Sequence, residues 1–264
     1  MKEKYYKDSE DLHMVHIQNI AYAADKIYDH TPLKILDIAT GSNGLNPCIV
    51  RTLGDWNINF ELVLSDISPT WLSGGYENLE NVLTDLELKK VKCVLADSTD
   101  LRKNLTDIPL WNLQITKPLE NILDDPHFYR FLRTGYNYGK RNVGFMNNSF
   151  DMVIGVCPYE NINKADYSYA IKESARVLKI GGYHIISDMH VEKINPDIER
   201  TESALRRANI KSIDITKSKI DEVMTPIAWY SAIYQYLTED RFPEQTLQNG
   251  DIVKMSVLIH QKIN

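Results

Sequence analysis

A carboxylate stands just ahead of a glycine-bearing turn near the start of the chain. Residues 33–44 read Leu-Lys-Ile-Leu-Asp-Ile-Ala-Thr-Gly-Ser-Asn-Gly, so Asp37 precedes Gly41 by four residues. Glycine lets a backbone approach a ligand closely because it has no β-carbon. A carboxylate aimed into such a turn would repel a pyrophosphate, but it can bind an ammonium group directly or through water. The spacing therefore indicates a cofactor site for a nucleotide-like ligand that carries an amine.

Two more carboxylates follow apolar runs farther along the chain. Asp66 follows the run 60–64 and one serine, and Asp97 directly follows the run 91–96. Both runs are typical of buried parallel strands. A carboxylate at the end of the second strand can accept both hydroxyls of a ribose. Parallel strands end at one edge of a sheet, so we expect Asp37, Asp66 and Asp97 to lie along that edge, although Asp97 alone could equally cap a helix.

These landmarks together resemble class I S-adenosylmethionine-dependent methyltransferases, whose first motif is an acidic residue followed by a Gly-x-Gly-x-Gly-like turn. Residues 150–156 resemble the fourth strand of that family, and residues 175–182 resemble its Arg-Val-Leu-Lys-x-Gly-Gly turn. Gly181 and Gly182 are expected to end the helix that precedes the fifth strand. The resemblance covers residues 33–188, and its specificity lies in the order of the landmarks.

The resemblance implies S-adenosylmethionine as the cofactor and a role for individual residues. The acidic residue of the third strand end would receive the adenine amino group, and Ser98 could add a contact. The chain departs from the family pattern where Ala39 and Asn43 replace frequent glycines and Gly44 falls one place late. The cofactor-binding residues implied by the resemblance are Asp37, Ala39, Gly41, Asp66, Ile67, Asp97, Ser98 and Cys157.

The catalytic demands of methyl transfer are modest, because proximity and exclusion of water do most of the work. A hydroxyl acceptor also needs a base to remove its proton. His190, placed two residues after the expected end of the fifth strand, is the predicted base, and a partly exposed loop histidine is the alternative. For an amine acceptor, Tyr159 and Glu160 could form a polar cradle. His13 and His16, in the N-terminal helix, are weaker candidates for the base.

The elements that must position these residues predict an α/β fold. We expect a Rossmann-like, seven-stranded, mostly parallel sheet whose last strand is antiparallel. A helix over residues 9–28 is predicted within an N-terminal helical cap, residues 1–32. Beyond the fifth strand, residues 195–209 read as a helix, residues 211–216 as a strand and residues 252–260 as the last strand.

One class I domain over residues 33–264 is predicted to carry two helical lid insertions, at about 101–148 and 219–245. The first insertion is rich in aromatic and basic residues, which suits a lid over a flat or anionic substrate or, alternatively, a packed helical decoration. Within the second, residues 221–243 are predicted to form an amphipathic helix that packs in the lid or at a dimer contact. That helix would carry Trp229, Tyr230, Tyr234 and Tyr236.

The amino-acid composition limits the classes of function that the protein could have. The 264 residues are 43% hydrophobic and 25% charged, which is enough for one large core. The net charge of −6 argues against a broad nucleic-acid surface. Cys48, Cys93 and Cys157 lack metal-like spacing, so reduced thiols and no metal site are expected. The polar N-terminus and the absence of a long apolar run predict a cytoplasmic protein without a membrane segment.

The predicted activity is therefore methyl transfer from S-adenosylmethionine to a small-molecule O- or N-acceptor, in a protein that could form a homodimer. An RNA or protein methyltransferase is one alternative, and a basic, open cleft would favour it. A non-catalytic, methyltransferase-like binding subunit is another, and turnover separates it from an enzyme. A dinucleotide-dependent oxidoreductase is less favoured, because Asp37 lies beneath the turn and Gly181 and Gly182 match the methyltransferase motif.

Overall fold

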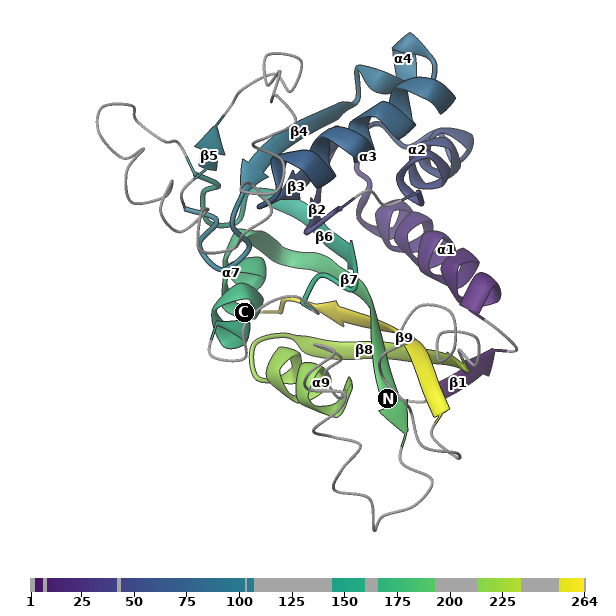
Figure 1. The fold of residues 1–264 in the computed structure, drawn as a ribbon, viewed down its shortest axis with the longest axis vertical. Helices are drawn as coiled ribbons and strands as arrows, with labels where there is room; N and C mark the ends of the chain where they lie inside the picture. Colours follow the sequence, from purple (N-terminus) through teal and green to yellow (C-terminus); the bar gives the residue numbers. More distant parts are fainter. Residues whose placement is uncertain are drawn as a thin grey trace.

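The described part of the chain forms a layered α/β structure, with helices on both faces of a single sheet (Figure 1). The computed structural model describes residues 3–6, 9–41, 44–102, 104–106, 144–159, 166–192, 213–233 and 252–263. The strands are β1 Glu3–Tyr6, β2 Leu33–Ile38, β3 Phe60–Asp66, β4 Val91–Ala96, β5 Asn104–Thr106, β6 Phe150–Val156, β7 Leu178–Glu192, β8 Thr225–Ile233 and β9 Ile252–Gln261. The helices are α1 Ser9–Ile27, α2 Asn46–Asp55, α3 Pro69–Val82, α4 Asp85–Leu88, α7 Tyr167–Val177 and α9 Ile213–Asp221.

The sheet has the strand order β1-β8-β9-β7-β6-β2-β3-β4-β5. Without the edge strands β1 and β5, seven strands remain, and β9 runs antiparallel to both of its neighbours, β7 and β8. The predicted seven-stranded, mostly parallel sheet with an antiparallel last strand is therefore confirmed. From β2 the chain moves outward to β3 and β4, then returns to β6 on the other side of β2. Ligands of open α/β sheets bind at such a reversal, outside the carboxyl ends of the strands.

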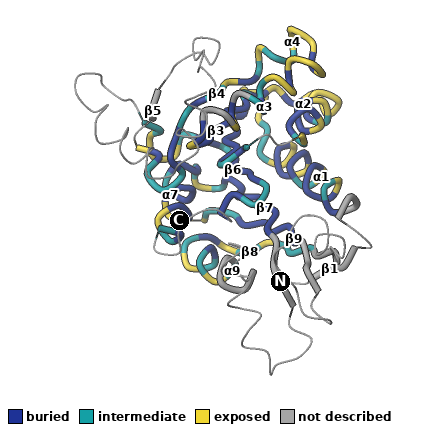
Figure 2. Tube along the Cα trace, in the orientation of Figure 1, coloured by how far each residue is buried: buried dark blue, intermediate teal, exposed yellow. Residues whose placement is uncertain are grey.

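Apolar residues cover both faces of the sheet, as expected for strands buried between two helical layers. Leu33 and Ile35 of β2 belong to a core shared with α1, α2 and α3, whereas Leu36 and Ile38 belong to a core shared with α7 and α9. Figure 2 shows the buried residues concentrated along the strands and on the sides of the helices that face them. The sheet is thus a rigid platform for the loops at its edge.

The predicted N-terminal helix is present as α1, Ser9–Ile27, which ends one residue before the predicted boundary. It packs on β7, β8 and β9 of the sheet and against α2. Leu12, Ile20 and Ala24 on its inner side are fully buried, which follows from their helical spacing. The segment 1–32 also contains β1, a parallel partner of β8, so the cap is not only helical.

Two predictions for the C-terminal part were wrong. Residues 211–216 were expected to be a strand, but α9 begins at Ile213, and its Lys217–Asp221 ion pair has the i,i+4 spacing of a helix. Residues 221–243 were expected to be a helix, but Thr225–Ile233 form β8 between β1 and β9. Threonine, isoleucine and aromatic residues favour a strand once partners lie on both sides. The segment 219–245 therefore contains a core strand and is not simply an insertion.

The turn before the fifth parallel strand also differs from expectation. Helix α7 ends at Val177, and β7 begins at Leu178, so the glycine pair lies inside the strand. The register of β6 and β7 is irregular there, because Phe150 pairs with Leu178 but Met152 pairs with Tyr183. A β-carbon at Gly182 would lie 2.6 Å from the carbonyl oxygen of Asp151. The glycine is needed for this bulge against β6 and not for a helix cap.

Several predictions fall wholly or mainly outside the described residues. These are the helix predicted over 195–209 and most of the first insertion, of which only its edges and the short strand β5 are described. None of the helices in the described ranges has the length and apolar content needed to span a bilayer.

Candidate functional site

The carboxyl ends of the central strands bring two of the predicted carboxylates together. Asp37 of β2 pairs with Leu64 of β3 on one side and with Ile154 of β6 on the other, so it lies at the reversal of strand order. Asp66 is the last residue of β3 and pairs with Leu95 of β4. The predicted arrangement of strand-end carboxylates along one edge of the sheet is therefore present.

Asp37 is buried at the base of the turn, with 1% of its surface exposed. Its Oδ2 accepts a hydrogen bond from the Thr40 hydroxyl over 2.6 Å, and the Asn46 amide donates to the same hydroxyl over 2.9 Å. Among the described residues, Oδ1 of Asp37 and Oδ1 of Asn46 have no hydrogen-bond partner. Burial, with a smaller contribution from the Asp66 charge, raises the pKa of Asp37 to about 7, and hydrogen bonds from Thr40 and Asn46 act against that shift. The turn thus holds two unpartnered acceptor oxygens and an easily protonated carboxylate.

Asp66 connects the glycine turn to the start of α3. Its Oδ2 accepts the backbone N–H of Gly41 over 2.8 Å, and its Oδ1 accepts that of Ser68, also over 2.8 Å. Burial raises the pKa of Asp66, and the N–H groups of Ser68, Gly41 and Ile67 oppose that shift. A carboxylate has about four lone-pair positions, so each oxygen can still accept a hydroxyl. Asp66 can therefore hold the turn and a ribose at the same time.

Asp97 follows β4 and lies two residues beyond Leu95, the register partner of Asp66. Its Oδ1 accepts the Thr99 backbone N–H over 2.9 Å and the Thr99 hydroxyl over 2.6 Å. These contacts fold the loop back on Asp97 as a local turn, and no helix begins within the described residues 97–102, so Asp97 is not the helix cap that was the alternative. Ser98 is half-buried in the same loop. A contact of Asp97 or Ser98 with adenine stays a prediction.

Left-handed backbone marks the turns that surround this edge. Ala39 has a φ of 50° and Gly41 a φ of 54°, so the alanine adopts a left-handed conformation that glycine adopts at much lower steric cost. Cys157, directly after β6, has a φ of 49° and donates its N–H to the Ser187 carbonyl over 2.7 Å. Ile67 is 37% exposed beside Asp66 and presents an apolar surface at this edge. Strained turns of this kind gather at ligand sites.

Tyr159 does not lie where the predicted polar cradle requires it. Its side chain is fully buried, and its hydroxyl lies 2.9 Å from Nε2 of His184 and 3.1 Å from Oγ of Ser174. His184 is the register partner of His260, whose Nε2 lies 2.9 Å from Oδ1 of Asp221. Burial raises the pKa of Tyr159 and lowers that of His184 to about 3. This buried polar network argues against direct contact of Tyr159 with an acceptor, because core hydrogen bonds already hold its hydroxyl.

The other predicted catalytic residues are either buried, within a strand, or outside the described residues. His190 lies within β7 and pairs with Lys254, so it is not in a loop after the strand as we expected. Its side chain and all of Glu160 lie outside the described residues. His16 is buried in α1, with Nδ1 2.9 Å from Oγ of Ser187, and burial lowers its pKa to about 3. A neutral histidine there joins α1 to β7.

Three residues in or beside the glycine turn, Thr40, Asn46 and Trp71, were not predicted from the sequence. The Thr40 hydroxyl donates to Asp37, the Asn46 amide donates to that hydroxyl, and the indole of Trp71 packs beside the glycine turn. Asn46 and Pro47 do mark the start of a helix, which was an available signal for a residue facing the turn. The signal for Trp71 was a large apolar residue in the first turn after the N-cap Ser68.

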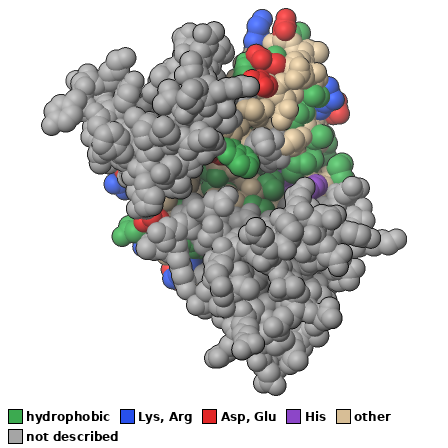
Figure 3. Space-filling view, viewed as in Figure 1, with side chains coloured by type: hydrophobic (Ala, Val, Ile, Leu, Met, Phe, Trp, Pro, Cys, Tyr) green, Lys and Arg blue, Asp and Glu red, His purple; other side chains and the backbone are tan. Residues whose placement is uncertain are grey.

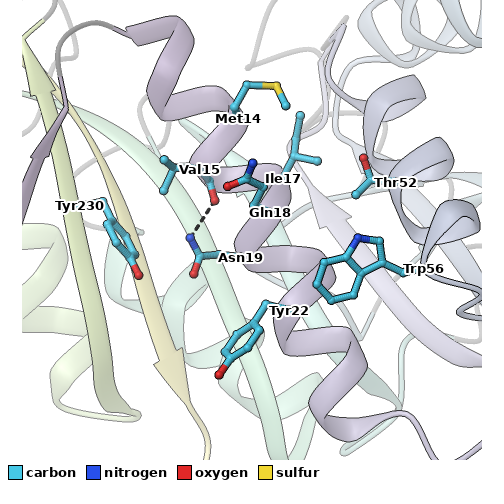
Figure 4. A pocket seen from close by; sticks show the side chains of 9 residues that line it. All are labelled: Met14, Val15, Ile17, Gln18, Asn19, Tyr22, Thr52, Trp56 and Tyr230. Carbon is cyan, nitrogen blue, oxygen red and sulfur yellow. Dashed lines mark hydrogen bonds between the residues drawn. The ribbon is translucent and has the colours of Figure 1, made fainter.

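A groove of about 520 Å³ lies over α1, between the end of α2 and β8, away from the strand-end carboxylates (Figure 4). Its lining residues are Met14, Val15, Ile17, Gln18, Asn19, Tyr22, Thr52, Trp56 and Tyr230. On the face drawn in Figure 3, the described side chains in the middle of the molecule are mainly hydrophobic, and charged ones lie toward the margins. The groove contains none of the predicted site residues, so we give it no part in the site.

Comparisons with known proteins agree with this architecture. No protein-family model matches the sequence, and no curated protein matches it. Solved structures do match. A candidate sarcosine dimethylglycine methyltransferase from Galdieria sulphuraria aligns over 97% of this chain and 87% of its own, with a TM-score of 0.60 and 12% identity. The chain has the class I methyltransferase fold.

Two further structures of this fold carry named ligands or substrates. Phosphoethanolamine N-methyltransferase 2 of Haemonchus contortus, in complex with phosphomonomethylethanolamine and S-adenosylhomocysteine, aligns over 93% of this chain and 53% of its own. Its TM-score is 0.51 and its identity 14%. An arsenic(III) S-adenosylmethionine methyltransferase of Chlamydomonas reinhardtii aligns over 94% and 73%, with a TM-score of 0.50 and 13% identity. The shared fold therefore hosts different acceptors.

Proposed function

We propose that this chain is an S-adenosylmethionine-dependent methyltransferase that acts on a small-molecule acceptor. The observation that carries the proposal is the buried Oδ1 of Asp37, an unpartnered acceptor at the reversal of strand order. An ammonium group donates hydrogen bonds and carries a positive charge, so it suits this oxygen, whereas a pyrophosphate does not. The methyltransferase fold supports the same choice over a dinucleotide.

The residues present fit the parts of this cofactor. Asp37, with Asn46 beside it, would accept from the ammonium, and the Gly41 turn allows close approach of the backbone. Asp66 would accept from the ribose hydroxyls while it keeps its bonds to the turn. Ile67 would pack against the adenine, and Asp97 would accept from its amino group. When bound, the cofactor supplies a methyl group already activated on a sulfonium, so the protein's task is to orient the acceptor and exclude water.

An amine is the acceptor that we would test first. Two of the similar structures have amine substrates in their names, sarcosine and dimethylglycine in one and phosphomonomethylethanolamine in the other. An amine needs only to be neutral when it attacks, whereas a hydroxyl needs a base. Two described histidines, His16 and His184, are buried and hydrogen-bonded, so neither offers a free base to a hydroxyl acceptor. This arrangement favours an N-acceptor over an O-acceptor.

Calorimetric titration tests the cofactor. We expect S-adenosylmethionine and S-adenosylhomocysteine to bind the purified chain and NAD⁺ not to bind. Binding of NAD⁺ with no response to either sulfur compound would refute the proposal.

Transfer of a labelled methyl group tests the activity. The donor would be incubated with sets of small amines, then with small phenols and alcohols, and finally with bulk RNA and protein. We expect label in the amine set. Label only in RNA or protein would assign a macromolecular acceptor instead, and binding of the donor without transfer to any set would identify a non-catalytic subunit.

A further inference from the structure

Trp71 is a large apolar side chain that stays exposed at the edge of the proposed cofactor site. It lies in the first turn of α3, where its backbone N–H donates to Oγ of the N-cap Ser68 over 3.3 Å. The side chain is 53% exposed, and Ile67, four residues earlier, is 37% exposed. Exposure alone is ordinary for single apolar side chains, so the placement of the indole at the proposed site is what gives it significance.

The indole lies directly over the glycine turn. A β-carbon at Gly41 would stand 3.2 Å from Cε3 of Trp71 and 3.7 Å from Cζ3, so the six-membered ring occupies the side where a side chain would project. The N–H of the same glycine donates to Asp66. The ring and the carboxylate therefore contact one residue from different directions.

A series of hydrogen bonds holds the indole of Trp71 in this position. Asp66 accepts from Gly41 through one oxygen and from Ser68 through the other, and Ser68 caps the turn that carries Trp71. The ring thus stands beside the carboxylate that we assign to the ribose. A sugar or base face that enters this corner would meet an aromatic ring as well as a hydrogen-bond acceptor, a combination that binds nucleosides tightly.

We propose that Trp71 is a cofactor-contacting residue whose indole covers the nucleoside part of S-adenosylmethionine held by Asp66 and the Gly41 turn. The inference rests on the proposed function, because it assigns a further contact within the same site. Its rival is a purely structural role, in which the ring only shields the glycine turn from water.

The experiment uses the full chain and S-adenosylhomocysteine as the probe, with calorimetry for affinity and intrinsic fluorescence for the indole. We expect wild-type fluorescence to change on binding and acrylamide to quench it less. Trp71→Phe should keep most of the affinity but lose most of the fluorescence change. Trp71→Ala should weaken binding about tenfold, which lies within the range known for stacking on an aromatic side chain.

Trp56→Phe is the matched control, because Trp56 is 45% exposed but lies at the end of α2, outside the site. It should keep both the affinity and the fluorescence change. Urea unfolding of each ligand-free variant checks that the fold is intact. Wild-type affinity in Trp71→Ala, or a full fluorescence change in Trp71→Phe, would leave only the shielding role. If the wild-type chain binds neither sulfur compound, the proposed function itself has failed, before any variant is compared.

Discussion

Replacing Asp37 by asparagine should stabilise the ligand-free protein at high pH while it weakens cofactor binding. Asp37 is buried with one oxygen unpartnered, and its pKa is raised from 3.8 to about 7. A carboxyl whose folded pKa is raised contributes its stability below the unfolded pKa and loses it as pH rises through the folded pKa. The free energy of unfolding of the wild-type protein should therefore fall between about pH 4 and pH 7.

The size of this fall follows from the two pKa values. With one pKa unit equal to about 1.4 kcal/mol, the full cost of ionising Asp37 in the folded state is about 4 kcal/mol. About 2.5 kcal/mol of that cost develops between pH 5 and pH 8. Asparagine does not titrate, so Asp37→Asn should gain about 2.5 kcal/mol on the wild type over this interval. The asparagine amide lacks a partner, which lowers the free energy of unfolding of the variant by about 1–3 kcal/mol. This loss is the same at pH 5 and pH 8, so it does not change the expected difference between them.

Urea unfolding at pH 5 and pH 8 measures this difference, and Asp55→Asn, at the exposed end of α2, is the control that should leave it unchanged. Binding gives the second readout. An ammonium favours the ionised carboxylate, so wild-type affinity for S-adenosylhomocysteine should rise as pH increases through about 7, and Asp37→Asn should bind weakly without that rise. Parallel stability curves for the variant and the wild type would refute the argument from burial, and unchanged affinity would refute the ammonium role.

Three further outcomes are expected. Asp66→Ala should weaken cofactor binding by roughly 1.5–3 kcal/mol through the loss of charge-assisted hydrogen bonds; calorimetry measures this, and wild-type affinity would exclude the ribose role. Tyr159→Phe should lower the free energy of unfolding by about 1–3 kcal/mol, because the buried His184 and Ser174 lose a partner. The rate of methyl transfer should stay the same. A slowed reaction with unchanged stability would instead support the predicted contact of Tyr159 with the acceptor. His184 has a depressed pKa, so its contribution to stability is present above about pH 6.5 and is lost as pH falls toward 3. The free energy of unfolding of His184→Gln should therefore fall less in acid than that of the wild type. An equal fall in both proteins would show that other groups cause the acid sensitivity.

The central sheet and its carboxylates could be predicted because the signals are local. Each apolar run, its terminal carboxylate and the turn that follows lie within a dozen residues, so Asp37 and Asp66 could be placed from the sequence. The strand β8 could not, since its aromatic residues fit a helix face equally well until β1 and β9 lie on either side of it. Pairing between distant segments decided the structure there.

The contacts within the site were less predictable than the carboxylates themselves. The bond from Gly41 to Asp66 spans 25 residues, and the placement of Trp71 on the glycine turn depends on it. Tyr159 followed a strand end as a substrate-binding residue would, but the backbone after β6 turns its side chain into the core. Position along the chain therefore predicted which edge a residue occupies and not the direction in which its side chain points.

The parallel pairing of β1 with β8 keeps one edge of the sheet incomplete for much of the protein's synthesis. Glu3 pairs with Trp229 and Tyr6 with Ala232, so β1 leaves the ribosome about 220 residues before its partner. At 5–20 residues per second, that interval lasts roughly 10 to 45 s. The other edge of β8 is paired by β9, Ile252–Gln261, which is made later still. Removal of β1 would leave the outer edge of β8 uncovered, and such an edge can recruit strands from neighbouring chains.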